Sequence, residues 1–236
     1  MLSIMESKYS NILTMILVVL IVAILGVVGY FTYGMFQTKS IDKNAQSALD
    51  EFDKATKTIS KSDSNENKVE DVAQEEEYNN PLDLLNTTNT EETTEKKEAK
   101  KTYMEDYEVM GKIKIPKTGI EYPVLNPLTK RSLEIAVAIA YGPGLNEVGN
   151  TVIYGHNYRR TGVFFSDNKK LSNGDKIYIT DQTGTTITYV IYNIYETSPN
   201  DASYMQRDTE GRREISLQTC TDDSSARIIV WAKEEV

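Results

Sequence analysis

Three side chains in this sequence are candidates for catalytic chemistry: Cys220, His156 and Arg227. Cys220 ends an apolar, strand-like run and precedes a polar turn, so its thiol is expected at a strand end beside a loop. His156 follows another apolar run in the same way, and Arg227 opens the run after the Cys220 turn. A thiol attacks as its thiolate, which a neighbouring imidazole or guanidinium favours. The pattern therefore suggests a cysteine nucleophile, a histidine acid–base and an arginine that stabilises negative charge.

Each of the three residues also has an ordinary structural interpretation. A lone cysteine is commonly a small buried hydrophobic residue, and a lone histidine commonly satisfies a backbone carbonyl. An arginine at a strand end is commonly solvated. A free thiol at a loop edge, however, is prone to oxidation. Residue positions alone leave both interpretations open.

Composition excludes several classes of protein. The chain has 236 residues, with 26 basic against 35 acidic side chains and a net charge of −9. Such a balance gives no electrostatic reason to bind nucleic acid. One cysteine and one histidine exclude an intramolecular disulfide and a Cys- or His-rich metal centre. We therefore expect no metal and no cofactor.

The N-terminal part of the chain divides into a short leading segment, residues 1–11, and an uncharged apolar run, residues 12–36. At a rise of about 1.5 Å per residue, a helix over this run exceeds the roughly 30 Å hydrocarbon core of a bilayer. A cleaved signal peptide is the alternative, but its apolar region is shorter and ends at a small-residue cleavage site. Residues 12–36 are predicted to be a transmembrane anchor, whose orientation the flanking lysines leave open.

Residues 37–102 carry 16 acidic and 10 basic side chains and few aromatic ones. Such a segment buries too little apolar surface to offset the entropy of ordering, so a charged flexible linker is expected. The alternative is a helix over residues 41–59. Its apolar residues at helical spacing are Ile41, Ala45, Ala48, Phe52, Ala55 and Ile59.

Residues 103–236 contain short apolar runs separated by turns rich in Gly, Asn and Asp. Closely spaced strands with such turns indicate an all-β barrel or sandwich rather than alternating strands and helices. One short helix is expected around residues 162–171. The eight expected strands are residues 111–116, 120–125, 135–141, 151–154, 176–180, 186–195, 214–220 and 226–232.

The run Ser216-Leu217-Gln218-Thr219-Cys220, followed by Arg227 and preceded by Gly155-His156-Asn157, resembles the sortase signature TLxTC…R with its separate GH motif. The opening run from Gly111 to Pro116 and the stretch from Pro143 to Asn150 are also similar to that family. The resemblance covers roughly residues 110–233. One departure is Ser216, where the family usually has threonine.

The resemblance implies an eight-stranded sortase-type β-barrel with short helices, carried by an N-terminal transmembrane helix and a disordered linker. It also implies a cysteine transpeptidase. Cys220 would attack the scissile carbonyl, and His156 would act as general acid and then general base. Arg227 would stabilise the oxyanion or orient the substrate. Asn157 and Thr219 are predicted to contact the substrate.

Sortases act on surface proteins with an LPxTG-like C-terminal signal and transfer them to an amine of a peptidoglycan precursor or cross-bridge. The resemblance therefore implies a cytoplasmic N-terminus and an extracellular catalytic domain. The short connection between Cys220 and Arg227 looks closest to class D, with class B possible, and residues 181–213 are expected to contain much of the signal-reading surface. Two alternatives remain: a thiol peptidase that only hydrolyses, and an anchored non-enzymatic β-domain that binds the cell wall.

Overall fold

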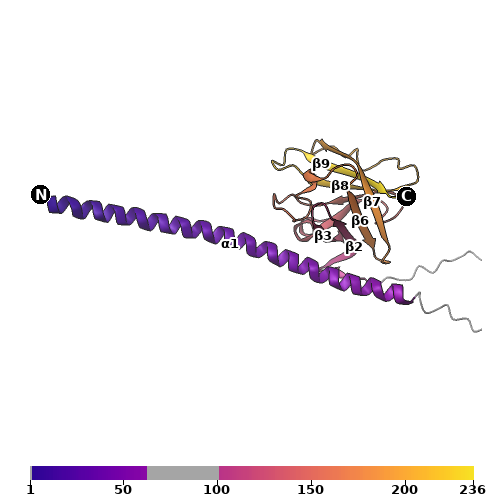
Figure 1. Cartoon of the computed structure of the whole chain (residues 1–236), viewed down its shortest axis with the longest axis horizontal. Coiled ribbons are helices and arrows are strands. Elements are labelled where there is room, and N and C mark those ends of the chain that lie inside the picture. The colour runs from indigo at the N-terminus through magenta and orange to yellow at the C-terminus, as the bar shows by residue number, and fades with distance from the viewer. Residues whose placement is uncertain (1, 63–100) are drawn as a thin grey trace, which may run out of the picture. The chain divides into compact units, whose positions relative to one another are not determined.

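The computed structural model describes residues 2–62 and 101–236 (Figure 1). The chain forms two compact units, one ending at Asn44 and the other extending from Ala45 to Val236. Helix α1 contributes residues to both units, and the strands all belong to the second. The elements are α1 (Leu2–Ser62), β1 (Tyr103–Met104), β2 (Tyr107–Ile115), β3 (Ile120–Asn126), α2 (Lys130–Ile135), β4 (Val137–Tyr141), β5 (Gly149–Tyr154), η1 (Asn168–Lys170, a 3₁₀ turn), β6 (Lys176–Asp181), β7 (Thr186–Thr197), β8 (Arg213–Cys220) and β9 (Arg227–Glu234).

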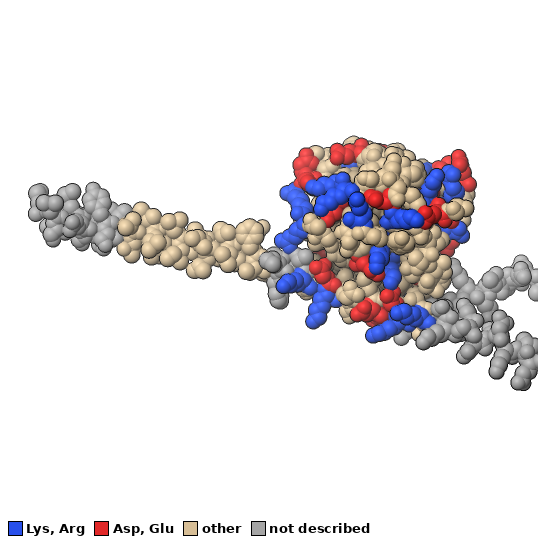
Figure 2. All heavy atoms as spheres, in the orientation of Figure 1, with Lys and Arg blue, Asp and Glu red and all other residues tan. Residues whose placement is uncertain are grey.

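The first unit contains an apolar, uncharged stretch of α1 from Leu13 to Tyr33. Its mean hydropathy is 2.8 over 21 residues, and all of its side chains are exposed. Figure 2 shows the same stretch without a basic or acidic side chain. At about 1.5 Å per residue, the stretch matches the roughly 30 Å hydrocarbon thickness of a bilayer. It is therefore a candidate membrane span, by length and composition, within the predicted anchor of residues 12–36.

Helix α1 continues through residues 37–62. This part of the predicted flexible linker is therefore helical, as in the alternative given for residues 41–59. One face of this segment is buried: Ala45, Ala48, Leu49, Phe52 and Thr56. Within the second unit, the carboxylate of Asp53 accepts a 2.7 Å hydrogen bond from Lys112 of β2. Burial of the apolar face supplies the free energy that orders an otherwise polar segment. The rest of the predicted linker, residues 63–100, lies outside the described residues.

The second unit is built around one closed sheet. Its strands follow the order β1-β2-β3-β4-β5-β8-β9-β7-β6, and β6 also pairs with β2. That pairing joins the two ends, so strands β2 to β9 form an eight-stranded barrel. The eight expected strands correspond to these eight, and the predicted all-β barrel is confirmed. Strand β1 is an additional two-residue strand paired with the start of β2.

Two short helical elements lie between the strands. The turn η1, Asn168–Lys170, falls inside the segment where a short helix was expected. Helix α2 was not expected; it begins after Thr129, whose side chain accepts a hydrogen bond from the Ser132 backbone amide in a capping box. The strand predicted from residue 135 therefore begins later, at Val137.

The barrel interior is filled by aliphatic side chains that alternate along each strand, as expected for strands with one buried face. Fully buried examples are Val109, Ile113, Ile115, Val124, Ile153, Ile177, Ile179, Ile215, Leu217 and Val230. This core fixes the register of the strands, since a slip of one residue would turn every aliphatic side chain outward. The strand ends, and the side chains on them, are positioned accordingly.

Candidate active site

The paired strands β5 and β8 bring His156 and Cys220 to the same edge of the barrel. They run parallel, and their last paired positions are Tyr154 and Gln218. The amide of Gly155 extends the pairing by donating to the carbonyl of Gln218 at 3.1 Å. His156 and Cys220 each lie two residues beyond that last pair. Since neighbouring strands lie about 4.8 Å apart, the imidazole and the half-buried thiol originate from adjacent strand ends.

The antiparallel neighbour β9 brings Arg227 to the same place. Arg227 is directly opposite Cys220 in the β8–β9 register. Side chains opposite each other in an antiparallel pair emerge on the same face. The Arg227 guanidinium donates from Nη1 to the carbonyls of Ser224, at 3.4 Å, and Ala226, at 3.0 Å. It therefore rests against the turn that joins the two strands.

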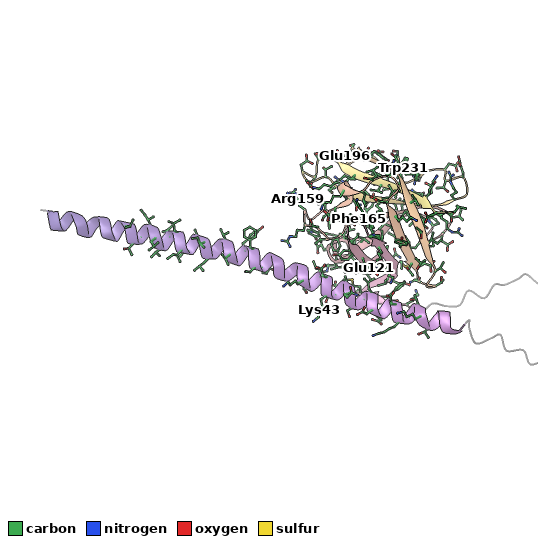
Figure 3. All side chains as sticks on the ribbon, in the orientation of Figure 1. Lys43, Glu121, Arg159, Phe165, Glu196 and Trp231 are labelled. Atoms are coloured by element: carbon green, nitrogen blue, oxygen red, sulfur yellow. The ribbon has the colours of Figure 1, made fainter. Side chains whose placement is uncertain are left out.

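Gly155, directly before the histidine, is required by packing. A Cβ at this position would lie 2.6 Å from the ring of Phe165 and 3.0 Å from Val137. Phe165, labelled in Figure 3, is completely buried. The amide of Phe165 donates to the carbonyl of His156 at 3.2 Å. The absence of a side chain at Gly155 thus lets the end of β5 lie directly on Phe165, which sets the backbone position of His156.

The imidazole of His156 is half-buried, and an aromatic ring covers part of it. Its ring centroid lies 5.4 Å from that of Tyr158, edge to face. Burial lowers the pKa of His156, because a charged ring loses hydration, while the carboxylate of Glu134 opposes this effect. At neutral pH the imidazole is therefore mainly uncharged and able to accept a proton.

We expect the His156 imidazole to titrate with a midpoint below its ordinary pKa of 6.5. His156 is the only histidine, so its ring signals in an NMR titration are assigned without a variant. The unfolded chain takes up this proton at a higher pH than the folded chain, so stability rises as pH increases from the folded pKa to 6.5. A midpoint at or above 6.5 would show that burial does not dominate.

The turn between Cys220 and Arg227 is held by its own hydrogen bonds. The amide of Thr221 donates to the carbonyl of Ala226 at 3.1 Å. Asp223 accepts hydrogen bonds from the hydroxyls of Thr221 and Ser225, each at 2.7 Å. These donors lower the pKa of Asp223 to about 2, so its carboxylate stays charged and bonded across the neutral range. The turn therefore keeps a fixed path between the two strands.

Asn157 and Thr219, the predicted substrate contacts, occupy different environments. The Asn157 amide donates to the carbonyl of Cys220 at 2.9 Å and to Asp222 at 3.0 Å. Both of its N–H groups thus have partners within the chain. Thr219 is 1% exposed, and its hydroxyl is buried without a hydrogen-bond partner. Because side chains alternate along β8, Thr219 points to the opposite face from Cys220.

The connection between β7 and β8, residues 198–212, covers part of the outer face of the barrel through Arg207, whose side chain is 11% exposed and which was not predicted from the sequence. The guanidinium of Arg207 donates to Glu214 at 2.7 Å and to the hydroxyl of Tyr192 at 2.6 Å. It also donates to Asn150 at 2.9 Å and lies 4.2 Å over the ring of Trp231. Trp231 is labelled on β9 in Figure 3. These contacts attach the connection to four strands, β5, β7, β8 and β9.

A second set of contacts attaches the same connection to β5, nearer the candidate site. The hydroxyls of Tyr154 and Tyr204 lie 2.7 Å apart, and burial raises the pKa of Tyr204. Asn150 donates to the carbonyls of Tyr204 and Met205. Beside this connection is an open hollow of about 710 Å³. Its lining residues are Tyr141, Gly142, Pro143, Asn150, Met205, Gln206 and Arg207.

Acidic side chains near the site are paired with cations or with donors of their own turn. Glu105 forms an ion pair with Arg131, in which Oε1 lies 2.6 Å from Nη2. Asp222 pairs with Lys169, and Asp223 is bonded within the 221–226 turn. Among the residues that the structure describes, no group of three or more His, Cys, Asp or Glu side chains is arranged to hold a metal.

Known proteins are similar to this chain in sequence and in fold. A sortase domain model matches residues 113–235. Sortase A of Bacillus anthracis is 34% identical over 125 residues, which cover 52% of this chain and 58% of that protein. Sortase A of Streptococcus agalactiae is 31% identical over 139 residues, which cover 54% of this chain and 53% of that protein. The chain thus spans a little over half the length of these curated relatives.

Among solved structures, a lid mutant of sortase A from Corynebacterium diphtheriae superimposes with a TM-score of 0.51 and 27% identity. The match covers 56% of this chain and 72% of that one. The family model matches more than half of the chain, so this protein belongs to the sortase family. The family prediction made from the Cys220, His156 and Arg227 motifs is confirmed.

Proposed function

We propose that this protein is a membrane-anchored cysteine transpeptidase that cleaves an LPxTG-like sorting signal and transfers the surface protein to a cell-wall amine. The observation that carries the proposal is the meeting of the only cysteine, the only histidine and Arg227 at one barrel edge. Cys220 and Arg227 lie in β8 and β9, whose register the core fixes, and His156 lies two residues past the end of β5. Membership of the sortase family supports the same chemistry.

The first half-reaction forms a thioester. The Cys220 thiolate attacks the carbonyl carbon of the scissile bond, and negative charge develops on the carbonyl oxygen. Arg227, which emerges on the face of Cys220, stabilises this oxyanion or orients the signal peptide. Formation of the thiolate transfers the thiol proton of Cys220 to His156, and His156 gives this proton to the leaving amine as the C–N bond breaks. The acyl group remains on sulfur.

The second half-reaction transfers the acyl group to an amine. The amine of a peptidoglycan precursor or cross-bridge attacks the thioester carbonyl, and His156 takes up its proton. The C–S bond breaks, which releases the new amide and restores the Cys220 thiolate. Asn157 and Thr219 remain proposed contributors to this site, Asn157 through the backbone of Cys220 and Thr219 through its place beside it in β8. No metal or cofactor has a step in this scheme.

The proposed cellular location of the protein follows from the proposed reaction. The apolar segment 12–36 anchors the chain in the membrane, with residues 1–11 in the cytoplasm and the catalytic domain, 103–236, outside the cell. The candidate span from Leu13 to Tyr33 supports this arrangement. Sorting signals and cell-wall amines are available on the outer side of the membrane. Residues 37–102 connect the anchor to the barrel, through the helical segment that ends at Ser62.

The subclass is proposed to be D, with class B as the alternative. The connection between β8 and β9 consists only of residues 221–226, without an added element. This short connection is the feature that favours class D. A panel of peptides that varies the LPxTG-like signal distinguishes the two classes by the preferred sequence.

The full chain in detergent micelles, mixed with fluorogenic LPxTG-like peptides and a graded concentration of a small amine acceptor, tests the proposal. We expect cleavage that accelerates with amine, and a peptide–amine conjugate visible by mass spectrometry. Cleavage without any conjugate would identify a thiol peptidase that only hydrolyses. Folded protein that cleaves no peptide in the panel would favour a non-enzymatic cell-wall-binding domain.

A further inference from the structure

Beyond the last backbone hydrogen bond between β5 and β8, one side chain connects the two strand ends. Asn157 follows His156 directly, and its amide donates to the carbonyl of Cys220 at 2.9 Å. The same amide nitrogen donates to the carboxylate of Asp222 at 3.0 Å. The residue beside the acid–base is thus bonded to the backbone of the nucleophile itself. Both N–H groups of the amide are used in this link.

The carboxylate of Asp222 holds that link to a third segment. Its second oxygen pairs with the ammonium of Lys169 in η1. Lys169 and the hydrogen bond from Asn157 lower the pKa of Asp222, so the carboxylate is charged at neutral pH. Asn157, Asp222 and Lys169 therefore connect the histidine loop, the cysteine turn and η1. We call these three residues the loop brace.

The other end of the Asn157 side chain shapes the histidine loop. Its carbonyl oxygen accepts a 2.8 Å hydrogen bond from the amide of Arg159. Arg159 has a left-handed backbone, with φ of 56°, and lies at the periphery of the unit in Figure 3. A hydrogen bond that reaches two residues along is the usual way in which asparagine stabilises a turn. All the polar atoms of the Asn157 side chain thus serve loop geometry.

The distance between two catalytic groups affects the rate, because the transition state requires the reacting atoms in a defined geometry. His156 and Cys220 lie past the last β5–β8 pair, and Cys220 is paired only with Arg227 of β9, so no pairing between β5 and β8 fixes the distance between the two side chains. A displacement of about 1 Å between reacting groups can cost up to about 10²-fold in rate. A brace attached to the residue after His156 and to the carbonyl of Cys220 limits such a displacement.

We propose that Asn157 and Asp222 are positioning residues that hold the imidazole of His156 in register with the thiol of Cys220. The inference rests on the proposed cysteine chemistry and assigns Asn157 a role in orientation rather than direct recognition of the substrate. Lys169 supports the pair from the outside. Its ion pair with Asp222 is about half-exposed, so its own contribution is the smallest of the three.

The test uses the full chain in detergent, with kcat and KM measured on a fluorogenic LPxTG-like peptide. Asn157→Ala and Asp222→Ala should each lower kcat by about 10- to 100-fold and change KM by less than about threefold. The double variant should be no slower than the slower single variant, because each change breaks the same link. Asp222→Asn keeps an oxygen that accepts from Asn157, so it should retain most of the activity that Asp222→Ala loses.

Lys176→Ala is the matched control, because it removes an ion pair of similar exposure, with Glu235, on a distant strand. Its kcat and KM should equal those of the wild type. An unchanged kcat in Asn157→Ala, with only a lower melting temperature, would overturn the inference in favour of a structural role. A raised KM with an unchanged kcat would overturn it in favour of direct substrate contact.

A second measurement separates failure of this inference from failure of the proposed function. Iodoacetamide alkylates Cys220 without any peptide substrate, and its rate depends on the thiolate that His156 helps to form. The ionisable side chains at this strand edge are His156, Arg227 and Asp222, and Lys169 and Arg159 act on the carboxylate of Asp222. We expect the rate at pH 7 to fall about threefold or more in Asn157→Ala but not in Lys176→Ala. Equal rates in all variants would overturn the inference even if no peptide is cleaved.

Discussion

Replacement of Cys220 by serine should lower kcat for cleavage of an LPxTG-like peptide by at least about 10³-fold, with the barrel still folded. A hydroxyl is a far weaker nucleophile than a thiolate, and the mainly neutral, half-buried His156 is too weak a base to compensate. Sulfur and oxygen differ little in volume, and the side chain is only half-buried, so the substitution leaves packing nearly intact. Steady-state kinetics on the fluorogenic peptide measure the loss of kcat, and circular dichroism measures whether the barrel is still folded.

The single cysteine provides an internal control for this prediction. Because Cys220 is the only thiol, alkylation modifies one site and should abolish the wild-type activity to the same extent. Mass spectrometry after mixing with peptide should show an acyl adduct on the wild type and none on Cys220→Ala. A serine variant that keeps more than about one tenth of the wild-type kcat would contradict nucleophilic catalysis by Cys220.

The identity of the candidate site was predictable from the sequence, but its assembly was not. The polar turn after Cys220 and the loop after the apolar run before His156 mark the two strand ends. Nothing in the sequence pairs these strands, because parallel neighbours are joined by long crossover connections whose length reveals no partner. The β5–β8 register supplies that information, and with it the partnership of Tyr154 with Gln218.

The helix after the candidate span shows why the linker was only partly predictable. Ala45, Ala48 and Phe52 were recognised at helical spacing, but charged residues between them are typical of a solvated segment. Leu49, also buried, completes the apolar face. Whether such a face is ordered depends on a partner surface, which only the folded barrel provides. Local composition therefore understates the order of this segment.

The outer face of β8 was the least predictable part. Glu214, Ser216 and Gln218 alternate with aliphatic residues, as in a strand with one solvated face. All three are nonetheless buried, because the β7–β8 connection lies over them. Arg207, in that connection, has the sequence context of an exposed loop residue. Its low exposure depends on Glu214 at the start of β8 and on Trp231 of β9, and neither contact is visible in the local sequence.

Replacement of Arg207 by alanine should lower the free energy of unfolding by about 3–5 kcal/mol, the cost of leaving one member of a buried ion pair without its partner. The Arg207 and Glu214 side chains are 11% and 3% exposed, and their closest atoms are 2.7 Å apart. Without the guanidinium, the Glu214 carboxylate keeps a 2.7 Å hydrogen bond from the hydroxyl of Tyr192 and a longer ion pair, of 3.8 Å, with Arg212. Urea unfolding of the full chain in detergent, followed by the fluorescence of Trp231, measures the loss. Trp231 is the only tryptophan and lies under Arg207, so its emission also reports opening of the β7–β8 connection.

Two further variants determine whether loss of charge pairing causes the lower stability of Arg207→Ala. Lys176→Ala removes an exposed pair with Glu235, whose atoms are also 2.7 Å apart, and should cost no more than about 1 kcal/mol. In Arg207→Met combined with Glu214→Gln, no unpaired charge is left and the contact with Trp231 is partly kept, so the loss should be smaller than in Arg207→Ala. A double variant as unstable as Arg207→Ala would attribute the effect to lost packing on Trp231 instead. Stability of Arg207→Ala within about 1 kcal/mol of the wild type would contradict the assignment of this buried pair as the main attachment of the connection.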